Sequence, residues 1–487
     1  MKFSILHISD LHRDLTNELG NAPLLESLVR DIEQRYPKND PPISKPSLCI
    51  VSGDLVYGAK AGSSNFAVEL TRQYNQANEI LVGIADRLFE GDRGRIILVP
   101  GNHDVSYNQV LNASQEIAIP SSAAERDTLV AELFKHKSKL RWSWGSLSFR
   151  RITDDTKYAE RLQDFALAYN TFYQGKRTFS LEPGLQYDIF DFPHLDFTVV
   201  GLSSCNENDP LNRTASIHPD ALAGATTDLR HAKYAGRLIG AVWHHSLSGV
   251  PTQNDYMDSE VLLHLADAGV SLGFHGHQHR AQCIEERHQI AGDGRKIVVV
   301  SASTLCAGPS QLSPGQPRGY NVVEIDAEQT KCRVHQRRMH NNDFTYPIWA
   351  PAYFIETNEP FLDLGIDRPL RPRPPHLDAA FKVETAEQLL GEGKWKEVVE
   401  LLAGIPPDSV GRPLLAKALS ENGDSAKTIE LLWPPVNPSE AVQIGDAILQ
   451  DGNSQQAAQF LALKIVSGGT DASVLEIARR VRERRAK

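Results

Sequence analysis

The sequence predicts an α/β sandwich over residues 1–350, from two patterns that alternate along the chain. Short runs rich in Val, Ile and Leu end abruptly at polar clusters that contain His, Asp or Gly, as buried strands do where they lead into a loop. Between several of these runs lie segments whose apolar residues recur at helical spacing. Strands and helices that alternate in this way pack as layers of helix against sheet.

The individual elements follow from the same patterns. The predicted strands are residues 3–8, 48–52, 96–99, 197–202, 238–243, 270–274 and 297–301. Helices are predicted at 66–89, which contains no Pro, and at 259–267. Residues 319–326 and 331–339 flank a polar turn, which is typical of an antiparallel hairpin at a sheet edge.

Two segments depart from the alternation. Residues 105–185 are polar and largely helical in pattern, and we interpret them as a helical insertion or cap over the sheet. Prolines are dense in 351–375, where the fixed φ angle and the missing N–H donor of proline prevent a continuous helix or a central strand. This composition predicts a linker between a domain at 1–350 and a second domain at 376–487.

The second domain contains an internal repeat. Residues 393–402 match 423–432 and 452–461 at offsets of 30 and 29 residues, and each copy follows a helical run that ends in Glu or Asp and then Gly. The unit is therefore a helix, a turn with Gly, and a helix, and three such units stack to bury their apolar stripes. The region resembles a tetratricopeptide-like array of helices.

Composition limits the class of protein. The 487 residues are 41% hydrophobic and 23% charged, which is typical of a globular chain. A formal net charge of -10 argues against a protein that is basic overall and coats nucleic acid. The five cysteines are scattered without a C-x-x-C pair, which favours a reducing compartment. Without a signal-peptide pattern or a long apolar run, we expect a soluble cytoplasmic protein with no membrane partner.

Five short motifs stand at or soon after the end of an apolar strand, or in the adjoining turn. They are Asp10-Leu11-His12, Gly53-Asp54, Gly101-Asn102-His103-Asp104, Trp243-His244-His245 and Gly276-His277-Gln278-His279. They bring two carboxylates, an amide oxygen and up to six imidazoles to the sheet edge where open α/β folds place their sites. Nitrogen and oxygen ligands without thiolate suit Mn, Fe, Zn or Ni, and the number of ligands suits two ions rather than one.

With these motifs in this order, residues 1 to about 340 resemble the calcineurin-like metallophosphoesterase superfamily. The resemblance implies a four-layer αββα sandwich and a hydrolase that acts on phosphate esters with two divalent metal ions, of which we expect Mn first and Fe, Zn or Ni as alternatives. It also implies that Asp54 bridges both ions. The remaining implied ligands are Asp10, His12 and His279 for the first ion, and Asn102, His244 and His277 for the second.

The same resemblance implies the chemistry. A hydroxide that bridges the two ions attacks phosphorus in line, while His103 lies beside the scissile phosphate as a catalytic group and is oriented by Asp104. His244 is the expected ligand because it directly follows the strand, but His244 and His245 could exchange roles. Segments 8–12 and 53–55 and this histidine pair look most like the cyclic-nucleotide phosphodiesterase branch, which makes a nucleotide-type phosphodiester the expected substrate.

Two other functions remain open at this stage. The basic run 135–151, interleaved with Trp142 and Trp144, suits a DNA or RNA nuclease, although a solvated cap helix whose tryptophans pack on the core explains it as well. Alternatively, the chain is a catalytically weak scaffold that binds a protein partner through its helical repeats. The basic tail 479–485 is interpreted as the polar face of a capping helix.

Overall fold

The computed structural model describes residues 2–486 apart from several short gaps. The gaps are residues 15–18, 136–137, 235, 250–254, 289–294, 309–310, 313–314, 342, 356, 368–374 and 404–410. The chain divides into two compact units, Met1–Pro369 and Leu370–Lys487. Within the described residues, no helix is both long enough and apolar enough to cross a membrane.

The first unit contains a sheet in the order β15-β14-β13-β1-β2-β3, with β16 also paired to β14. Strands β1, β2 and β3 are mutually parallel, and β13 and β14 form the predicted antiparallel hairpin. The strands are β1 (Phe3–Ile8), β2 (Leu48–Val51), β3 (Ile96–Leu98), β13 (Gly319–Ile325), β14 (Lys331–Met339), β15 (Trp349–Pro351) and β16 (Phe361–Gly365).

A second sheet has the order β11-β12-β10-β9-β8-β7. Strands β8, β9, β10 and β12 are parallel to one another, and β7 and β11 close the two edges in antiparallel orientation. The strands are β7 (Tyr187–Phe192), β8 (Phe197–Leu202), β9 (Leu238–Val242), β10 (Val270–His275), β11 (Gln282–His288) and β12 (Arg295–Ser301). All seven strands predicted from apolar runs are therefore present in the two sheets.

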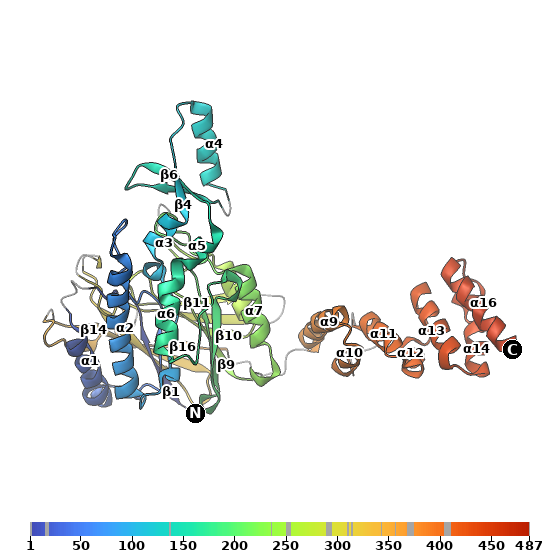
Figure 1. The fold of residues 1–487 in the computed structure, drawn as a ribbon. Helices are drawn as coiled ribbons and strands as arrows, with labels where there is room; N and C mark the ends of the chain where they lie inside the picture. Colours follow the sequence, from blue (N-terminus) through green and yellow to red (C-terminus); the bar gives the residue numbers. More distant parts are fainter. Residues whose placement is uncertain are drawn as a thin grey trace. The chain divides into compact units, whose positions relative to one another are not determined.

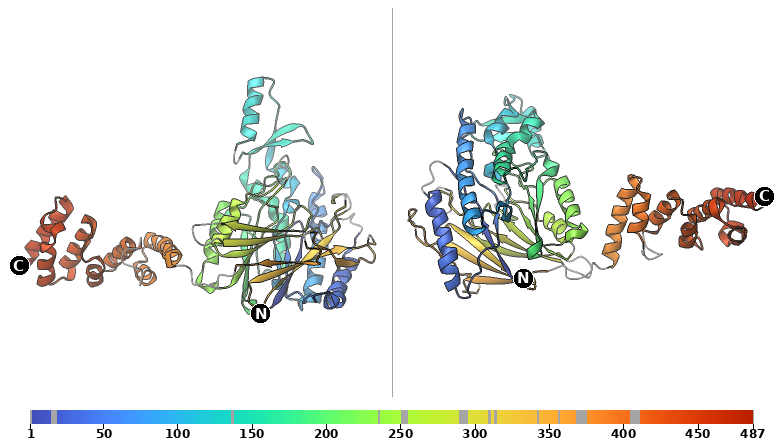
Figure 2. Two further views of the ribbon diagram at one scale, coloured as in Figure 1. Left: turned by 180° about the vertical axis from the view of Figure 1, so that it is seen from behind. Right: turned by 60° about the horizontal axis from the view of Figure 1, so that its bottom comes forward.

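The two sheets pack face to face between layers of helices. Phe3 of β1 contacts Phe197 of β8 with ring centroids 5.2 Å apart, and the same core includes apolar side chains of α1 (Asn21–Arg30), α2 (Phe66–Leu88) and α6 (Gln163–Phe172). On the other side, α7 (Pro219–Leu229) and α8 (Glu260–Asp267) bury the outer face of the second sheet in a separate core (Figures 1 and 2). This arrangement confirms the predicted four-layer αββα sandwich.

The insertion at 105–185 contains helices, but it also contains a small sheet that the sequence analysis did not predict. Its elements are α3 (Tyr107–Asn112), β4 (Ser114–Ile117), α4 (Ala123–Leu133), β5 (Leu140–Ser143), β6 (Ser148–Ile152) and α5 (Asp155–Ala159), followed by α6. Strands pair in the order β4-β6-β5, and Figure 1 shows β4, β6 and α4 together at one end of the unit. Trp142 and Phe149 are direct cross-strand partners with ring centroids 4.8 Å apart, so the cap-helix interpretation of this run is wrong.

The predicted linker also differs from the structure. Strand β16 lies inside the range 351–375 and pairs with β14, and β15 pairs with β14 farther along it. The hairpin of β13 and β14 is therefore covered on its outer side rather than lying at the sheet edge. Residues 368–374, the most proline-rich part, are outside the described residues.

The second unit consists of helices, as the repeat predicts. They are α9 (Pro375–Gly391), α10 (Trp395–Leu401), α11 (Arg412–Glu421), α12 (Ser425–Leu432), α13 (Pro438–Asp451), α14 (Ser454–Ala462), α15 (Lys464–Ser467) and α16 (Ala472–Ala486). The second helix of each repeat copy is α10, α12 or α14. Gly393 and Gly423 have φ angles of 72° and 76°, a backbone conformation that favours glycine at the turn between paired helices.

The basic tail is partly used within this unit. Arg484 donates to the carbonyl oxygens of Ile448 and Leu449 near the end of α13, and Arg479 pairs with Glu476 and Glu483 of its own helix. A cation at a helix C-terminus is favourable because the last carbonyls lack helical partners. The tail therefore has a structural role as part of the last helix.

Candidate active site

The five sequence motifs meet at one edge of the two sheets. Asp10 follows β1, Asp54 follows β2 and Asn102 follows β3, while His244 and His277 follow β9 and β10 of the second sheet. Within each sheet these strands are parallel to one another, so their carboxyl ends lie at a common edge. Residues up to 269 positions apart in the chain, such as His279 and Asp10, come within 3.3 Å of one another.

The loops that carry these side chains have an unusual backbone. Eleven non-glycine residues of the described chain have a positive φ angle, and five of them lie in the motifs. Such conformations cost energy for residues with a Cβ and persist where the surrounding structure requires them, often at functional sites. The five are Asp10 (53°), His12 (42°), Asp54 (54°), His277 (75°) and His279 (55°).

Two motif glycines permit the loops to approach closely. A Cβ atom on Gly101 would lie 2.1 Å from Oδ1 of Asp54 and 2.5 Å from its backbone nitrogen. A Cβ atom on Gly276 would lie 1.8 Å from Oγ of Ser9 and 2.6 Å from Oδ2 of Asp10. In both places the absent side chain leaves the space that a carboxylate of the site occupies.

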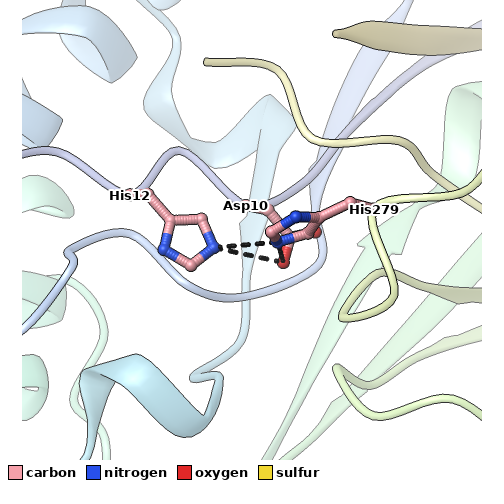
Figure 3. Close-up of side chains that lie close together, drawn as sticks. All are labelled: Asp10, His12 and His279. Atoms are coloured by element: carbon pink, nitrogen blue, oxygen red, sulfur yellow. Dashed lines mark hydrogen bonds and ion pairs between the residues drawn. The ribbon is translucent and has the colours of Figure 1, made fainter. Parts of the chain in front are cut away.

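Asp10, His12 and His279 form one cluster of potential ligands. Figure 3 shows the two imidazoles turned toward each other beside the carboxylate. Nε2 of His12 lies 3.1 Å from Nε2 of His279 and 3.6 Å from Oδ1 of Asp10, and Nε2 of His279 lies 3.3 Å from the same oxygen. This set offers two nitrogens and one oxygen to a single point.

Asn102, His244 and His277 form a second group. Oδ1 of Asn102 lies 3.0 Å from Nε2 of His244 and 2.9 Å from Nδ1 of His277. Oδ2 of Asp54 joins the two groups, since it lies 3.3 Å from Nε2 of His244 and 3.5 Å from Nε2 of His12. All seven predicted ligands are thus brought together, with Asp54 between the two groups.

Hydrogen bonds on the far side of two imidazoles define which nitrogen faces the site. Nδ1 of His244 lies 2.8 Å from the carbonyl oxygen of Ser52, and Nδ1 of His279 lies 3.0 Å from that of Gln311. A carbonyl oxygen only accepts, so each Nδ1 carries a proton and each neutral ring turns the lone pair of Nε2 inward. The nitrogen and oxygen atoms that face the site therefore act as hydrogen-bond acceptors.

Converging acceptors need protons or cations between them. Burial disfavours the charged form of His244, but the Asp54 carboxylate outweighs burial and raises the pKa of His244 to about 9. Buried Oδ1 of Asp10 has no hydrogen-bond partner among the described residues. Two carboxylates, an amide oxygen and four imidazoles in two groups fit a pair of divalent cations, which would replace those protons.

The structure distinguishes His244 from His245. Oγ of Ser204 accepts from the backbone N–H groups of both histidines at 3.2 Å, so its own proton is free to donate to Nδ1 of His245 at 2.8 Å. Burial lowers the pKa of His245 well below its ordinary value, so the ring is neutral and its proton is on Nε2. Neither nitrogen of His245 then offers a free lone pair, which favours His244 as the ligand.

His103 lies beside the ligand groups, but Asp104 does not contact its ring as predicted. A ring nitrogen of His103 lies within 4.8 Å of the ligand atoms of His12 and Asp54. Its Nδ1 lies 2.8 Å from the carbonyl oxygen of Tyr57. The carboxylate of Asp104 instead accepts from the backbone N–H groups of Gly101 and Leu55 and from the hydroxyl of Tyr74, because it points into the core below the loops.

A cavity of about 800 Å³ adjoins the ligand groups. Asn102, His103 and His277 line it on the side of the clustered ligands, and Tyr57, Lys60 and Arg213 are among its other lining residues. Tyr57 is 43% exposed and stacks on His103 with ring centroids 5.3 Å apart. The cavity thus combines the ligand cluster, an aromatic ring and two cations.

Four residues outside the five motifs support the site and were not predicted from the sequence. Tyr57, Ser204, Gln311 and Asp255 each contact a motif histidine. Tyr57 lies three residues after Asp54, but the other three stand in loops without a periodic or local pattern. No signal in the sequence alone points to them.

The chain was compared with families of known proteins. A family model described as calcineurin-like phosphoesterase matches residues 3–281, more than half of the chain. No curated protein is similar enough to match the sequence.

Several solved structures match over most of their own length. A dimetal phosphatase from Danio rerio is 10% identical with a TM-score of 0.36, and the match covers 69% of this chain and 96% of that chain. A single mutant of Vps29 from Entamoeba histolytica is 8% identical with a TM-score of 0.26, over 74% and 99% of the two chains. Vps29 from Chaetomium thermophilum is 9% identical with a TM-score of 0.24, over 75% and 97%.

Proposed function

Because this chain belongs to the calcineurin-like phosphoesterase family, a family of metal-dependent phosphoester hydrolases, we infer that it hydrolyses a phosphodiester of a nucleotide-type substrate at the edge where its five motifs meet. The observation that carries the proposal is the double ligand group joined by Asp54, whose Oδ2 lies 3.5 Å from His12 and 3.3 Å from His244. Two ions bound there would polarise the phosphate ester and activate water for in-line attack. Mn is the expected metal, with Fe, Zn or Ni as alternatives.

The chain's own groups would bind the ions and move one proton. Asp10, His12 and His279 would hold one ion, and Asp54 would contact both. Asn102, His244 and His277 would hold the other. Nδ1 of His103 donates to the carbonyl oxygen of Tyr57, so in the doubly protonated ring Nε2 would deliver its proton to the leaving oxygen and leave a neutral imidazole that keeps the proton on Nδ1.

The cavity supports a nucleotide-type substrate. Tyr57 offers an exposed aromatic face beside His103, on which a base can stack. Lys60 and Arg213 line the same cavity and can neutralise an anionic group that the ions do not reach. A base, a sugar and one or two phosphates fit a volume of about 800 Å³.

A substrate screen tests the proposal. The full chain is freed of metal with a chelator, reloaded with Mn²⁺, Fe²⁺, Zn²⁺ or Ni²⁺, and assayed on phosphomonoesters, bis(p-nitrophenyl) phosphate, cyclic nucleotides and labelled oligonucleotides. We expect about two ions per chain and hydrolysis of nucleotide diesters. Absence of hydrolysis of every ester with two ions bound would overturn the proposal.

Two variants test the substrate class. Tyr57→Leu and Arg213→Gln should raise KM for a nucleotide diester about ten-fold while leaving dimethyl phosphate, which has no aromatic ring, nearly unaffected, because only the nucleotide has a base and further groups that reach these residues. Tyr353→Leu is the matched control, since Tyr353 is 60% exposed and does not line this cavity. Equal effects on both substrates would remove the nucleotide assignment but not the phosphoesterase.

A small substrate is favoured over a nucleic acid by the ion pairs of the insertion. Arg141 pairs with buried Asp209 at 2.8 Å, and Arg151 forms a two-point contact with Glu132. Arg150 bonds to Ser114 and lies 3.6 Å from Glu116. Because carboxylates already neutralise these arginines, they would contribute little to binding a phosphate backbone. The oligonucleotides in the screen decide between the two functions.

The helical unit is proposed to bind a protein partner, because stacked helix pairs present an extended surface for a peptide or helix. Loss of a partner on truncation after residue 369 would support this, and an unchanged set of partners would oppose it. None of the five cysteines, all of which lie within the described residues, forms a disulfide, and this supports the proposed cytoplasmic location.

A further inference from the structure

We propose that Asp255 is a positioning residue of the metal centre, whose carboxylate holds His277 in the tautomer that turns Nδ1 toward the ions; this rests on the proposed function. Oδ2 of Asp255 lies 3.4 Å from Nε2 of His277, an ion-pair distance. On the other side of the ring, Nδ1 lies 2.9 Å from Oδ1 of Asn102. Both oxygens only accept, so one proton cannot serve both sides of a neutral ring; with an ion between Nδ1 and Oδ1 of Asn102, that proton would lie on Nε2, toward the carboxylate.

The same arrangement recurs at two other histidines of the site. The outer nitrogen of His244 contacts the carbonyl oxygen of Ser52, and that of His279 contacts the carbonyl oxygen of Gln311. In both, the nitrogen opposite this contact faces the ligand cluster. His277 differs because its outer partner is charged, and a carboxylate on the outer nitrogen makes the inner nitrogen a stronger ligand than a carbonyl does.

Backbone contacts fix the surroundings of Asp255 and of His277. The backbone N–H of Met257, two residues after Asp255, donates to the carbonyl oxygen of Ser246 at 2.8 Å, in the segment 246–249 that follows His245. Gln278, next to His277, donates to the carbonyl oxygen of Ser248 in the same segment. The contact between Asp255 and His277 therefore joins two segments that are already tied together.

One atom of Asp255 supports a role in the site rather than in the fold. Its Oδ1 is buried and has no hydrogen-bond partner among the described residues. A carboxylate kept for stability alone would have its oxygens satisfied by neighbouring donors. Asp255 also lines the cavity of the candidate site, together with His277.

The experiment measures metal binding to the metal-free full chain. Mn²⁺ is titrated into the wild type and into Asp255→Asn, Asp255→Ala and Asp255→Glu, and binding is followed by calorimetry and by the paramagnetic resonance of free Mn²⁺. We expect one of the two ions to bind about 10- to 100-fold more weakly to the Asn and Ala variants, and Asp255→Glu to restore part of the loss. The second ion should bind nearly as in the wild type.

A matched control separates positioning from a general effect. Asp220→Asn also removes a carboxylate beside a histidine, since Oδ2 of Asp220 lies 3.8 Å from Nδ1 of His218, but this pair lies outside the site and Asp220 is 83% exposed. Asp220→Asn should leave the Mn²⁺ affinity of both sites unchanged. The melting temperatures of all metal-free proteins should agree, because a purely structural role would lower that of the Asp255 variants.

The outcomes distinguish this inference from the proposed function. Unchanged Mn²⁺ affinity in both Asp255→Asn and Asp255→Ala, or equal weakening of both ions, would overturn the role of Asp255. A wild type that binds two ions but hydrolyses no ester would overturn the proposed function while the affinities still test Asp255. A wild type that binds no Mn²⁺ would overturn both.

Discussion

Nδ1 of His103 lies 2.8 Å from the carbonyl oxygen of Tyr57, and the two rings stack with an interplanar angle of 26°. A carbonyl oxygen cannot donate, so this contact keeps a proton on Nδ1 and reserves Nε2 for exchange with a substrate. The backbone of one loop thus orients the imidazole of another. Asp104, the expected orienting residue, binds two backbone N–H groups of these loops instead.

The first prediction separates proton transfer from metal binding. His103→Ala should keep its metal content and lose about two to four orders of magnitude in turnover, because it removes a proton donor but no ligand. Asp54→Asn should lose metal as well as activity, because Asp54 joins the two ligand groups. Elemental analysis and kcat of both variants give the result. Equal metal loss in the two variants would make His103 a ligand.

A second prediction concerns the space beside Asp54. Gly101→Ala should weaken metal binding about ten-fold or more, because its Cβ would meet Oδ1 of Asp54 at 2.1 Å and displace the carboxylate. Gly145→Ala is the matched control, since a Cβ there meets no atom within 4 Å. Titration with Mn²⁺ measures both. Unchanged affinity in Gly101→Ala would show that the loops can separate at little cost.

A third prediction concerns a buried ion pair between Asp31, which directly follows α1, and Arg337 of β14. Arg337 contacts both carboxylate oxygens of Asp31, at 2.5 and 2.8 Å, and both side chains are almost fully buried. Arg337→Met should cost about 3–5 kcal/mol of the free energy of unfolding, because it leaves Asp31 charged and buried. Arg333→Met, which breaks an exposed pair with Asp363, should cost about 1 kcal/mol or less. Denaturant unfolding compares them, and equal losses would contradict this explanation.

A fourth prediction concerns pH. Burial opposes ionisation of Glu324, but contacts with His335, Ser44 and Lys2 outweigh it and lower its pKa from 4.5 to about 2. A carboxyl with a lowered pKa in the folded state stabilises the fold above pH 4.5, and this contribution is lost as the pH falls from 4.5 to 2. The wild type should therefore lose more stability across that range than Glu324→Gln, by at most about 3 kcal/mol. If the free energies of unfolding of the two proteins fell equally with pH over this range, the lowered pKa of Glu324 would be contradicted.

The candidate site could be predicted where the functional residues follow shortly after the strand that positions them. The strand that ends at Ile8 and the one that ends at Val51 are continuous apolar runs, and each is followed at once by the polar motif that it positions. The strands of the insertion were not predictable in this way. Trp142 and Phe149 belong to short, half-polar strands that are stabilised by pairing with each other. The residues of either strand alone do not show that the other strand will pair with it.

The sequence by itself determined the fold class, the five motifs, the residue types that can hold two ions and the repeat of paired helices, because periodicity and strand-end chemistry are properties of consecutive residues. Only the tertiary structure decided which nitrogen of each imidazole faces the site, that His245 is bound to Ser204, and that Asp255 stands behind His277. These contacts join loops without any pattern of their own. Hydrogen bonds of this kind depend on where separate segments meet in space, which no spacing along the chain encodes.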